Sequence, residues 1–338
     1  MTSLEYTLPE KAIAQSPMEP RDASKLMVVS AQGIAHKHFY DLPSLLAPGD
    51  LVIANNTRVT ALRLFGERET GGKVEALLLR ETAPGTYEAL TKPAKRLCVG
   101  SRISFGEGLL AEVADAGEGG FRTLRFGNAS DLNVRLSEIG RLPLPPYFHG
   151  DLATDERYQT IYSSTPGSSA APTAGLHFTH STMEALAERD VEVAYVTLDV
   201  GIDTFRPVQA ENLDDHKMHG ERYDIPKDTV EAVRNAKGRI VAIGTTSVRA
   251  LESAAVGKRS LRSGSGTSTL FVRTGYEFQI IDAMVTNFHM PKTTMLHMVA
   301  ALCGDETLND AYQVALANDY RFLSFGDAML VFWPAIGE

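Results

Sequence analysis

The stretch Ser168–Phe178 (SSAAPTAGLHF) combines small residues, one proline and one glycine with side chains that can contact a ligand. Such a backbone can come close to a bound molecule, and it delivers Thr173, His177 and Phe178 just before an expected helix. The imidazole of His177 is suited to general base catalysis. It is equally suited to capping the helix, so the stretch predicts a site wall with a candidate base.

A second stretch, Thr286–Pro291 (TNFHMP), has the same character. Asn287, Phe288 and His289 offer an amide, an aromatic face and an imidazole at successive positions. An amide beside an aromatic ring suits hydrogen bonding and stacking to a purine, and His289 is a second candidate proton carrier. An asparagine in a turn before proline is also common without any ligand.

Two carboxylates follow an expected strand over Val191–Leu198. Asp199 and Asp203 flank a short Val-Gly-Ile segment, and Thr204 comes next. Ligands of parallel α/β sheets bind beyond the carboxyl ends of the strands, so these carboxylates are placed to attract a cation or to act as a base. Turn and capping residues would show the same pattern.

The segment Ile240–Glu252 (IVAIGTTSVRALE) predicts a buried strand that ends at Gly244 and a helix opened by Thr245 and Thr246. Free backbone N–H groups and hydroxyls at a helix start suit an anion such as a carboxylate or a phosphate. Arg249 follows on the same helix. The alternative is that the hydroxyls only cap the helix.

Signatures of metal and nucleotide binding are weak. Asp214–Glu221 holds two histidines and three carboxylates, a pattern shared by metal sites, polar site walls and solvated loops. Cys98 and Cys303 form no CxxC pair, which argues against a thiolate zinc site and a disulfide framework. Gly106–Ala111 matches a dinucleotide fingerprint without the helix it needs, and Ser263–Gly266 is expected to be a mobile loop. We expect no metal.

Charge limits the possible partners. The 338 residues include 33 Lys and Arg against 42 Asp and Glu, a formal charge of −9 that repels nucleic acid. Binding of RNA therefore needs a local basic face, for which Arg58, Lys92, Lys95 and Arg96 are the candidates, although a solvated surface is the common alternative. With no secretion signal and no apolar run of the ~18 residues that a membrane helix needs, we expect a cytoplasmic protein.

The elements that position these residues show two patterns. Lys25–Ser30 and Ile34–Tyr40 predict a hairpin, and Leu51–Ala54 predicts the next strand. From residue 61, β runs of about 6–8 residues alternate with Gly-rich turns, which is typical of a small barrel or sandwich. The prolines of Leu142–Tyr147 (LPLPPY) end this β-rich region.

Beyond the prolines, helices and strands alternate. One helix, over residues 130–139, is expected before the prolines. After them, helices are expected over residues 181–189, 227–236, 247–255, 294–302 and 308–317. Strands are expected over residues 191–198, 240–243, 269–272, 278–281 and 329–333. Such alternation predicts a parallel or mixed sheet covered by helices. The expected fold is a mixed-sheet α/β domain of residues 1–60 and 150–338, with a small β-barrel domain inserted at 61–149.

A series of motifs in order along nearly the whole chain resembles the S-adenosylmethionine:tRNA ribosyltransferase-isomerase family of queuosine biosynthesis. The motifs include GDLVIANNTRVTALRL, KPAKRL, RLPLPPY, GSSAAPTAGLHFT, TLDVGIDTFRPV, DDHKMHGE, AIGTTSVRALES, TNFHMPKTTML and YRFLSFGDAML. The resemblance implies an α/β domain interrupted by a β-barrel. It also implies transfer of the ribosyl part of S-adenosylmethionine to 7-aminomethyl-7-deazaguanine at the wobble position of tRNA, giving epoxyqueuosine, adenine and methionine.

This resemblance makes S-adenosylmethionine a consumed co-substrate and tRNA carrying the precursor base the partner, and we expect a monomer or a weak homo-oligomer. The reaction needs a base for the C5′ proton, a proton donor for adenine and an anchor for the methionine carboxylate. The residues assigned to these tasks are His177, His289 and Asp199 for proton transfer, Thr245, Thr246 and Arg249 for the carboxylate, Asn287 and Phe288 for the purine, and Thr173, Phe178, Asp203 and Thr204 for further substrate contacts.

The sequence departs from the family pattern at a few positions. Asp199 stands where the family has His and Asp203 where it has Gly, and Leu323 and Phe325 replace Phe and Tyr. An aspartate can act as a base or pair with a sulfonium, but it cannot become cationic as imidazole can. Two alternatives therefore stay open: a relative that uses S-adenosylmethionine on another acceptor, possibly a small molecule, and a non-catalytic RNA- or nucleoside-binding protein.

Overall fold

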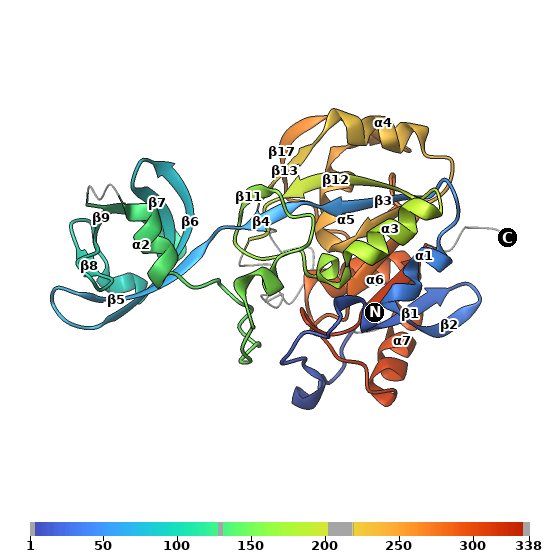
Figure 1. The fold of residues 1–338 in the computed structure, drawn as a ribbon, viewed down its shortest axis with the longest axis horizontal. Coiled ribbons are helices and arrows are strands. Elements are labelled where there is room, and N and C mark those ends of the chain that lie inside the picture. Colours follow the sequence, from blue (N-terminus) through green and yellow to red (C-terminus); the bar gives the residue numbers. More distant parts are fainter. Residues whose placement is uncertain (1–3, 128–130, 202–217, 219, 334–338) are drawn as a thin grey trace. The chain divides into compact units, whose positions relative to one another are not determined.

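The computed structural model describes residues 4–127, 131–201, 218 and 220–333. The chain forms two compact units (Figure 1). The first contains Met1–Arg58, Pro145–Thr165 and Ala171–Glu338, and the second contains Val59–Leu144 and Pro166–Ala170. The chain passes between the units within β4 (Thr57–Val59) and close to β11 (Thr165–Ser168).

The first unit is built on a mixed nine-stranded sheet. In spatial order its strands are β17 (Gly264–Ser268), β13 (Glu221–Ile225), β12 (Glu192–Leu198), β3 (Leu51–Asn55), β14 (Ile240–Ile243), β18 (Ala283–Asn287), β19 (Ala328–Phe332), β1 (Lys25–Ser30) and β2 (Gly33–His38). The four central strands, β12, β3, β14 and β18, are parallel to one another, and β19 runs antiparallel to β18. Their carboxyl ends therefore meet at one edge of the sheet.

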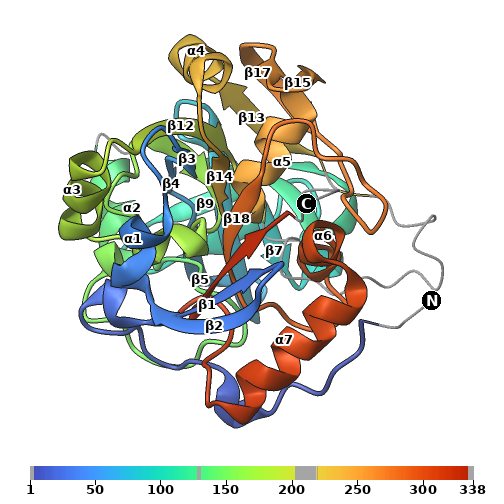
Figure 2. The ribbon, with the colours of Figure 1, turned by 90° about the vertical axis from the view of Figure 1, so that its right-hand side faces the viewer.

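Helices cover both faces of this sheet. They are α1 (Leu42–Leu45), α3 (His180–Glu188), α4 (Lys227–Asn235), α5 (Gly244–Ala254), α6 (Thr294–Cys303) and α7 (Asp305–Ala317), and a short hairpin joins β15 (Ala255–Gly257) to β16 (Ser260–Leu261). Figure 2 shows α1 and α3 on one face and α5 and α6 on the other. β3, β14 and β18 are buried along their whole length, and their sequences LVIAN, IVAI and AMVTN are apolar except at the carboxyl ends of β3 and β18.

The second unit is a closed antiparallel barrel. Around the barrel the strands are β10 (Phe121–Phe126), β7 (Thr86–Lys92), β6 (Lys73–Ala83), β5 (Leu62–Arg68), β8 (Arg102–Ser104) and β9 (Leu110–Ala116), with α2 (Leu132–Ile139) after them. Alternate residues such as Leu64, Ala76 and Leu124 fill its interior. The predicted fold class, a mixed-sheet α/β domain with a small barrel, is confirmed.

Most expected elements are present, and three expectations are wrong. No strand forms over residues 269–272 or 278–281; the chain instead forms β17 and β18 on either side of this region. The Gly-Ser segment expected to be a mobile loop supplies the first residues of β17, because pairing with β13 orders it. Helix α5 begins at Gly244, directly before Thr245 and Thr246, the residues expected to open it.

Candidate active site

Most of the candidate site residues lie where the parallel strands end. Asp199 follows β12, Gly244 follows β14, and Asn287 is the last residue of β18. Between them β3 ends at Asn55, whose buried amide donates to the Leu198 carbonyl at 2.9 Å and accepts from the Leu198 N–H at 3.0 Å. This side chain extends the ladder by one step and holds the turn that carries Asp199.

A small cavity of about 40 Å³ lies at this edge. Its lining comprises Tyr147, Ala171, Pro172, Thr173, Ala174, Val200, Gly244, Thr245, Thr246, Thr286, Asn287, Phe288, His289, Met290, Thr293, Met295, Leu323 and Ser324. Since one water needs roughly 10–15 Å³ by this measure, the cavity admits a few waters or one functional group of a larger ligand. Six predicted site residues, Thr173, Thr245, Thr246, Asn287, Phe288 and His289, are part of this lining.

The first turn of α5 forms one wall of the cavity. Gly244 has φ +81°, a conformation that side chains disfavour, and a Cβ there would lie 3.4 Å from the Cβ of Ala174. Its N-cap residue, Ile243, offers no side-chain acceptor to the first N–H groups. The Oγ1 atom of Thr246, a residue only 7% exposed, has no hydrogen-bond partner among the described residues. Uncapped N–H groups and an unpaired hydroxyl leave donors available to a ligand.

A buried hydrogen-bonded chain supports the opposite wall. The Thr173 hydroxyl donates to Oδ1 of Asn287 at 3.1 Å, and Nδ2 of Asn287 lies 3.1 Å from Nε2 of His177. Because the amide donates to Nε2, a neutral His177 carries its proton on Nδ1 and donates it to Oγ of Ser24, 2.8 Å away. His177 therefore lies behind Asn287, outside the cavity lining, and fixes the direction of the amide.

His177 is held uncharged by its surroundings. Its ring stacks on Phe39 with centroids 5.0 Å apart, and burial together with the positive charges of Arg321 and Arg21 lowers its pKa to about 3. A second, smaller cavity of about 20 Å³ contacts it from the side of Arg21 and Arg157. At neutral pH His177 is a hydrogen-bonding group and not a cation.

His289 lies in the cavity wall itself. Its Nε2 is 2.8 Å from Oγ1 of Thr286, its N–H donates to the Tyr312 hydroxyl at 2.9 Å, and its carbonyl accepts from the Tyr6 hydroxyl. Burial lowers the pKa of His289 to about 3, so this imidazole is also neutral. Both predicted proton carriers are therefore uncharged at neutral pH.

Asp199 is half-buried at the same sheet edge. Its Oδ1 accepts from the Thr57 hydroxyl at 3.5 Å, and its N–H donates to the Arg222 carbonyl at 2.9 Å. The next residue, Val200, lines the cavity. Asp203, Thr204 and most of the Asp214–Glu221 cluster lie outside the described residues.

Three predicted substrate contacts lie in the protein interior. Arg249, 7% exposed, is ion-paired with Glu221 and donates to the Ser268 carbonyl at 3.2 Å. Phe178 packs in the core between Phe39 and Tyr162, while Phe288, fully buried, touches the cavity but packs mainly on other aromatic rings. The rings around Phe288 are Tyr312, Tyr320 and Phe322.

Sequence reasoning missed one wall of the cavity. Tyr147 and Ser324 contribute a pair of hydroxyls 2.6 Å apart, and burial raises the pKa of Tyr147 to about 12. Leu323 beside them adopts φ +71°, and its N–H donates to the Phe288 carbonyl at 3.0 Å. The motifs RLPLPPY and FLSFGD contain these residues, but Tyr147, Leu323 and Ser324 themselves carry no charge or metal-binding group that would single them out.

Comparison with known proteins identifies the family. The family model described as queuosine biosynthesis protein matches residues 1–331. The chain belongs to this family. It is 49% identical over 333 residues to the S-adenosylmethionine:tRNA ribosyltransferase-isomerase of Gloeobacter violaceus, covering 97% of this chain and 95% of that protein. It is 47% identical to the protein of the same name from Symbiobacterium thermophilum, covering 98% and 99%.

A solved structure agrees with this membership in the queuosine biosynthesis family. The crystal structure of S-adenosylmethionine tRNA ribosyltransferase from Thermotoga maritima matches with a TM-score of 0.54 at 34% identity. The match covers 97% of this chain and 99% of that one.

The described residues of this queuosine family member contain neither a metal-binding cluster nor a membrane-spanning helix. These residues contain no cluster of three or more His, Cys, Asp or Glu side chains that could hold a metal ion. No helix among them is long and apolar enough to span a membrane.

The four predicted RNA-binding residues differ in their surroundings. Arg58, in the first unit, is ion-paired with Glu156 and donates to Oγ of Ser163 at 3.1 Å. Lys92, Lys95 and Arg96, in the barrel, are exposed, and no ion pair of theirs is found within the described part of the chain.

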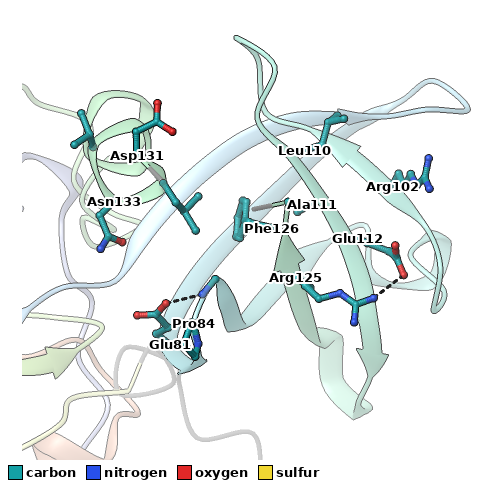
Figure 3. Close-up of a pocket in the computed structure, with 14 residues that line it drawn as sticks. Glu81, Pro84, Arg102, Leu110, Ala111, Glu112, Arg125, Phe126, Asp131 and Asn133 are labelled. Carbon is teal, nitrogen blue, oxygen red and sulfur yellow. Dashed lines mark hydrogen bonds and ion pairs between the residues drawn. The ribbon is translucent and has the colours of Figure 1, made fainter. Parts of the chain in front are cut away.

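The barrel also carries an open hollow of about 720 Å³ between its strands and α2 (Figure 3). Each of its charged side chains has a partner: Arg125 turns toward Glu112, with 3.2 Å between Nη2 and Oε1, while Arg102 pairs with Glu69 and Asp131 with Arg135. Glu81 accepts from the N–H of Gly85 at 2.8 Å. A hollow whose charges are already paired gives no indication of a substrate, so the cavity at the sheet edge is the candidate active site.

Proposed function

We propose that this protein is an S-adenosylmethionine:tRNA ribosyltransferase-isomerase. It would transfer and isomerise the ribosyl group of S-adenosylmethionine onto 7-aminomethyl-7-deazaguanine at the tRNA wobble position and release adenine and methionine. The observation that carries the proposal is identity of 47–49% to two proteins of this name over nearly the full length of each chain. The sheet-edge cavity, lined by polar groups from separate elements, supports it.

The start of α5 is the proposed anchor for the methionine carboxylate. The uncapped helix and the unpartnered Thr246 hydroxyl supply hydrogen-bond donors and a positive dipole end to an anion. Thr245 lies beside it in the cavity wall. Arg249 is already neutralised by Glu221, so its proposed task is to tie α5 to β13 and β17.

Asp199 is the proposed base for the C5′ proton. His177 is already engaged by Asn287 and Ser24 and His289 by Thr286, which leaves the carboxylate as the candidate base. The adjacent sulfonium acidifies the C5′–H bond and would favour a nearby carboxylate. Neutral His289, which lines the cavity, and Asn287, held by His177, would hydrogen-bond the leaving adenine. Phe288 and Thr173 would complete this wall.

The barrel residues Lys92, Lys95 and Arg96 are the proposed contacts to tRNA phosphates. They are exposed cations, and phosphate contacts supply much of the affinity for nucleic acid. Arg58 would contribute less because Glu156 already pairs with it.

The test is incubation with S-adenosylmethionine and tRNA bearing the precursor base, with tRNA bearing guanine as the matched control. We expect free adenine and modified tRNA only with the precursor tRNA. Adenine formed only with a different acceptor, or no adenine with any acceptor, would refute the proposal. For Asp199→Asn we expect loss of tRNA-dependent hydrogen exchange at C5′, while S-adenosylmethionine binding is retained.

A further inference from the structure

Most arginines of the barrel unit form ion pairs with carboxylates. Five of them form ion pairs with carboxylates of the same unit: Arg63 with Glu75, Arg80 with Glu88, Arg102 with Glu69, Arg125 with Glu112 and Arg135 with Asp131. The segment from Lys92 to Arg96 departs from this pattern, because its three cations are exposed and form no ion pair within the described residues. A phosphate that met this segment would displace no carboxylate.

Acidic neighbours of the segment are few. Glu75 lies opposite Lys92 in the β6–β7 ladder, but its carboxylate is engaged by Arg63, with 3.3 Å from Nε to Oε1. Glu118 belongs to the short helical turn Glu118–Gly120 that packs near Ala94–Arg96 and is exposed to solvent. The local surface is therefore cationic although the whole chain carries a charge of −9.

Arg122, on β10, holds this segment from beneath. Its Nη2 donates to the Ala94 carbonyl and its Nε to the Leu97 carbonyl, each at 2.6 Å. Its Nη1 donates to the carbonyls of Gly117 at 3.0 Å and Phe121 at 2.6 Å. One guanidinium thus joins both ends of the turn Ala94–Arg96 to the neighbouring strand connection, using the fixed fork of donors that lysine lacks.

Packing adds to this restraint. Leu97 is fully buried in the barrel core. Gly120, with φ +98°, lies so close that a Cβ would be 3.3 Å from the Thr91 carbonyl oxygen and 3.5 Å from the Ala94 Cβ. The Thr91 hydroxyl donates to the Gly120 carbonyl at 3.2 Å. The backbone between Thr91 and Leu97 is fixed while the side chains of Lys92, Lys95 and Arg96 extend into solvent.

We propose that Arg122 is a positioning residue that preforms a phosphate-binding surface of Lys92, Lys95 and Arg96 for the RNA backbone. This inference rests on the proposed tRNA-modifying function. A fixed backbone lowers the ordering cost of binding, since only the side chains of the three cations remain to be ordered on the phosphates. The partner is identified by its chemistry, a polyanionic backbone met by unpaired cations.

The experiment compares Arg122→Lys with Arg125→Lys in precursor-tRNA binding over a series of salt concentrations. Both substitutions keep the charge, and Arg125 lies on the same strand but pairs with Glu112 at the surface. Removing Lys95 and Arg96 charges (K95Q/R96Q) should lower the slope of log affinity against log salt by about 0.7–0.9 per lost phosphate contact. We expect Arg122→Lys to weaken binding about tenfold and to lower the slope by about 1, with R125K unchanged.

A merely structural role for Arg122 would not produce this pattern. We further expect Arg122→Lys to add nothing to K95Q/R96Q, to raise KM for tRNA more than it lowers kcat, and to leave S-adenosylmethionine affinity unaltered. An unchanged salt slope in R122K, or effects that add to those of K95Q/R96Q, would overturn the inference. If the wild-type protein failed to bind or modify precursor tRNA at all, the proposed function itself would fall, which is a separate and distinguishable result.

Discussion

Acidification from pH 7.5 to 5 should destabilise the folded protein through its two buried histidines. Both His177 and His289 have pKa values of about 3 when folded against 6.5 in a model peptide. The unfolded chain therefore binds more protons below pH 6.5, so the stability is fully present above 6.5 and is lost as the pH falls toward 3. Each group removes about 1.4 kcal/mol per pH unit in this window, or about 2 kcal/mol at pH 5.

The variant His177→Gln isolates one of these contributions. It loses stability at pH 7.5 because Asn287 and Ser24 lose a well-placed partner, a cost of roughly 1–3 kcal/mol for an unsatisfied buried group. Its further loss between pH 7.5 and 5 should be smaller than that of the wild type by about 2 kcal/mol. Burial raises the pKa of Glu252 and of Asp327, which stabilises the folded state at low pH, but this effect cancels in the comparison.

Urea unfolding of both proteins at the two pH values measures the difference. Equal losses in wild type and His177→Gln would mean that His177 takes up a proton in the folded state. Nδ1 would then still donate to Ser24, Nε2 would donate to the oxygen of a flipped Asn287 amide, and His177 would be a cationic acid.

Three other changes test the walls of the cavity. Thr246→Val should weaken S-adenosylmethionine binding in calorimetry about tenfold, while the free energy of unfolding stays equal or rises, because the lost hydroxyl has no partner in the described structure. Phe288→Ala should lower the free energy of unfolding by roughly 3–5 kcal/mol in urea titrations, as expected for a fully buried aromatic residue; a loss of ligand affinity without loss of stability would instead make Phe288 a site residue. Gly244→Ala should cost about 1–2 kcal/mol by the same assay because φ is +81°, and a neutral result would contradict that backbone conformation.

The sequence predicted the buried strands well because their apolar runs have no other stable environment. β14 forms over the expected residues Ile240–Ile243, and the hairpin of β1 and β2 forms with its Gly-containing turn. The strand expected over residues 278–281 fails for a long-range reason: the N–H groups of Gln279 and Ile280 donate to the carboxylate of Glu252 on α5, at 2.9 and 3.0 Å. The local sequence pattern around residues 278–281 does not indicate that the Glu252 carboxylate competes as an acceptor.

The site was predictable only as far as strand ends indicate it. Asn287 ends one buried strand and Thr245 comes just after another, and both line one cavity. Arg249 shares a helix with Thr245, yet Glu221, 28 positions away in sequence, pairs with it and keeps it inside the protein. Phe178, expected to contact the substrate, instead packs against Phe39 and Tyr162 in the core. Charge pairs and aromatic packing between distant segments decide these cases.

The cavity wall combines strong hydrogen-bonding capacity with little fixed charge. No Asp, Glu, Lys or Arg contributes to the described lining, and its one imidazole, His289, is neutral. An unpaired buried charge would cost the empty protein several kcal/mol, whereas amides, hydroxyls and a helix start keep the fold stable and still favour the ionic ends of a ligand. In our proposal, the proton beside the sulfonium is removed by the half-buried Asp199, which precedes Val200 of the lining and whose carboxylate accepts a hydrogen bond from the Thr57 hydroxyl.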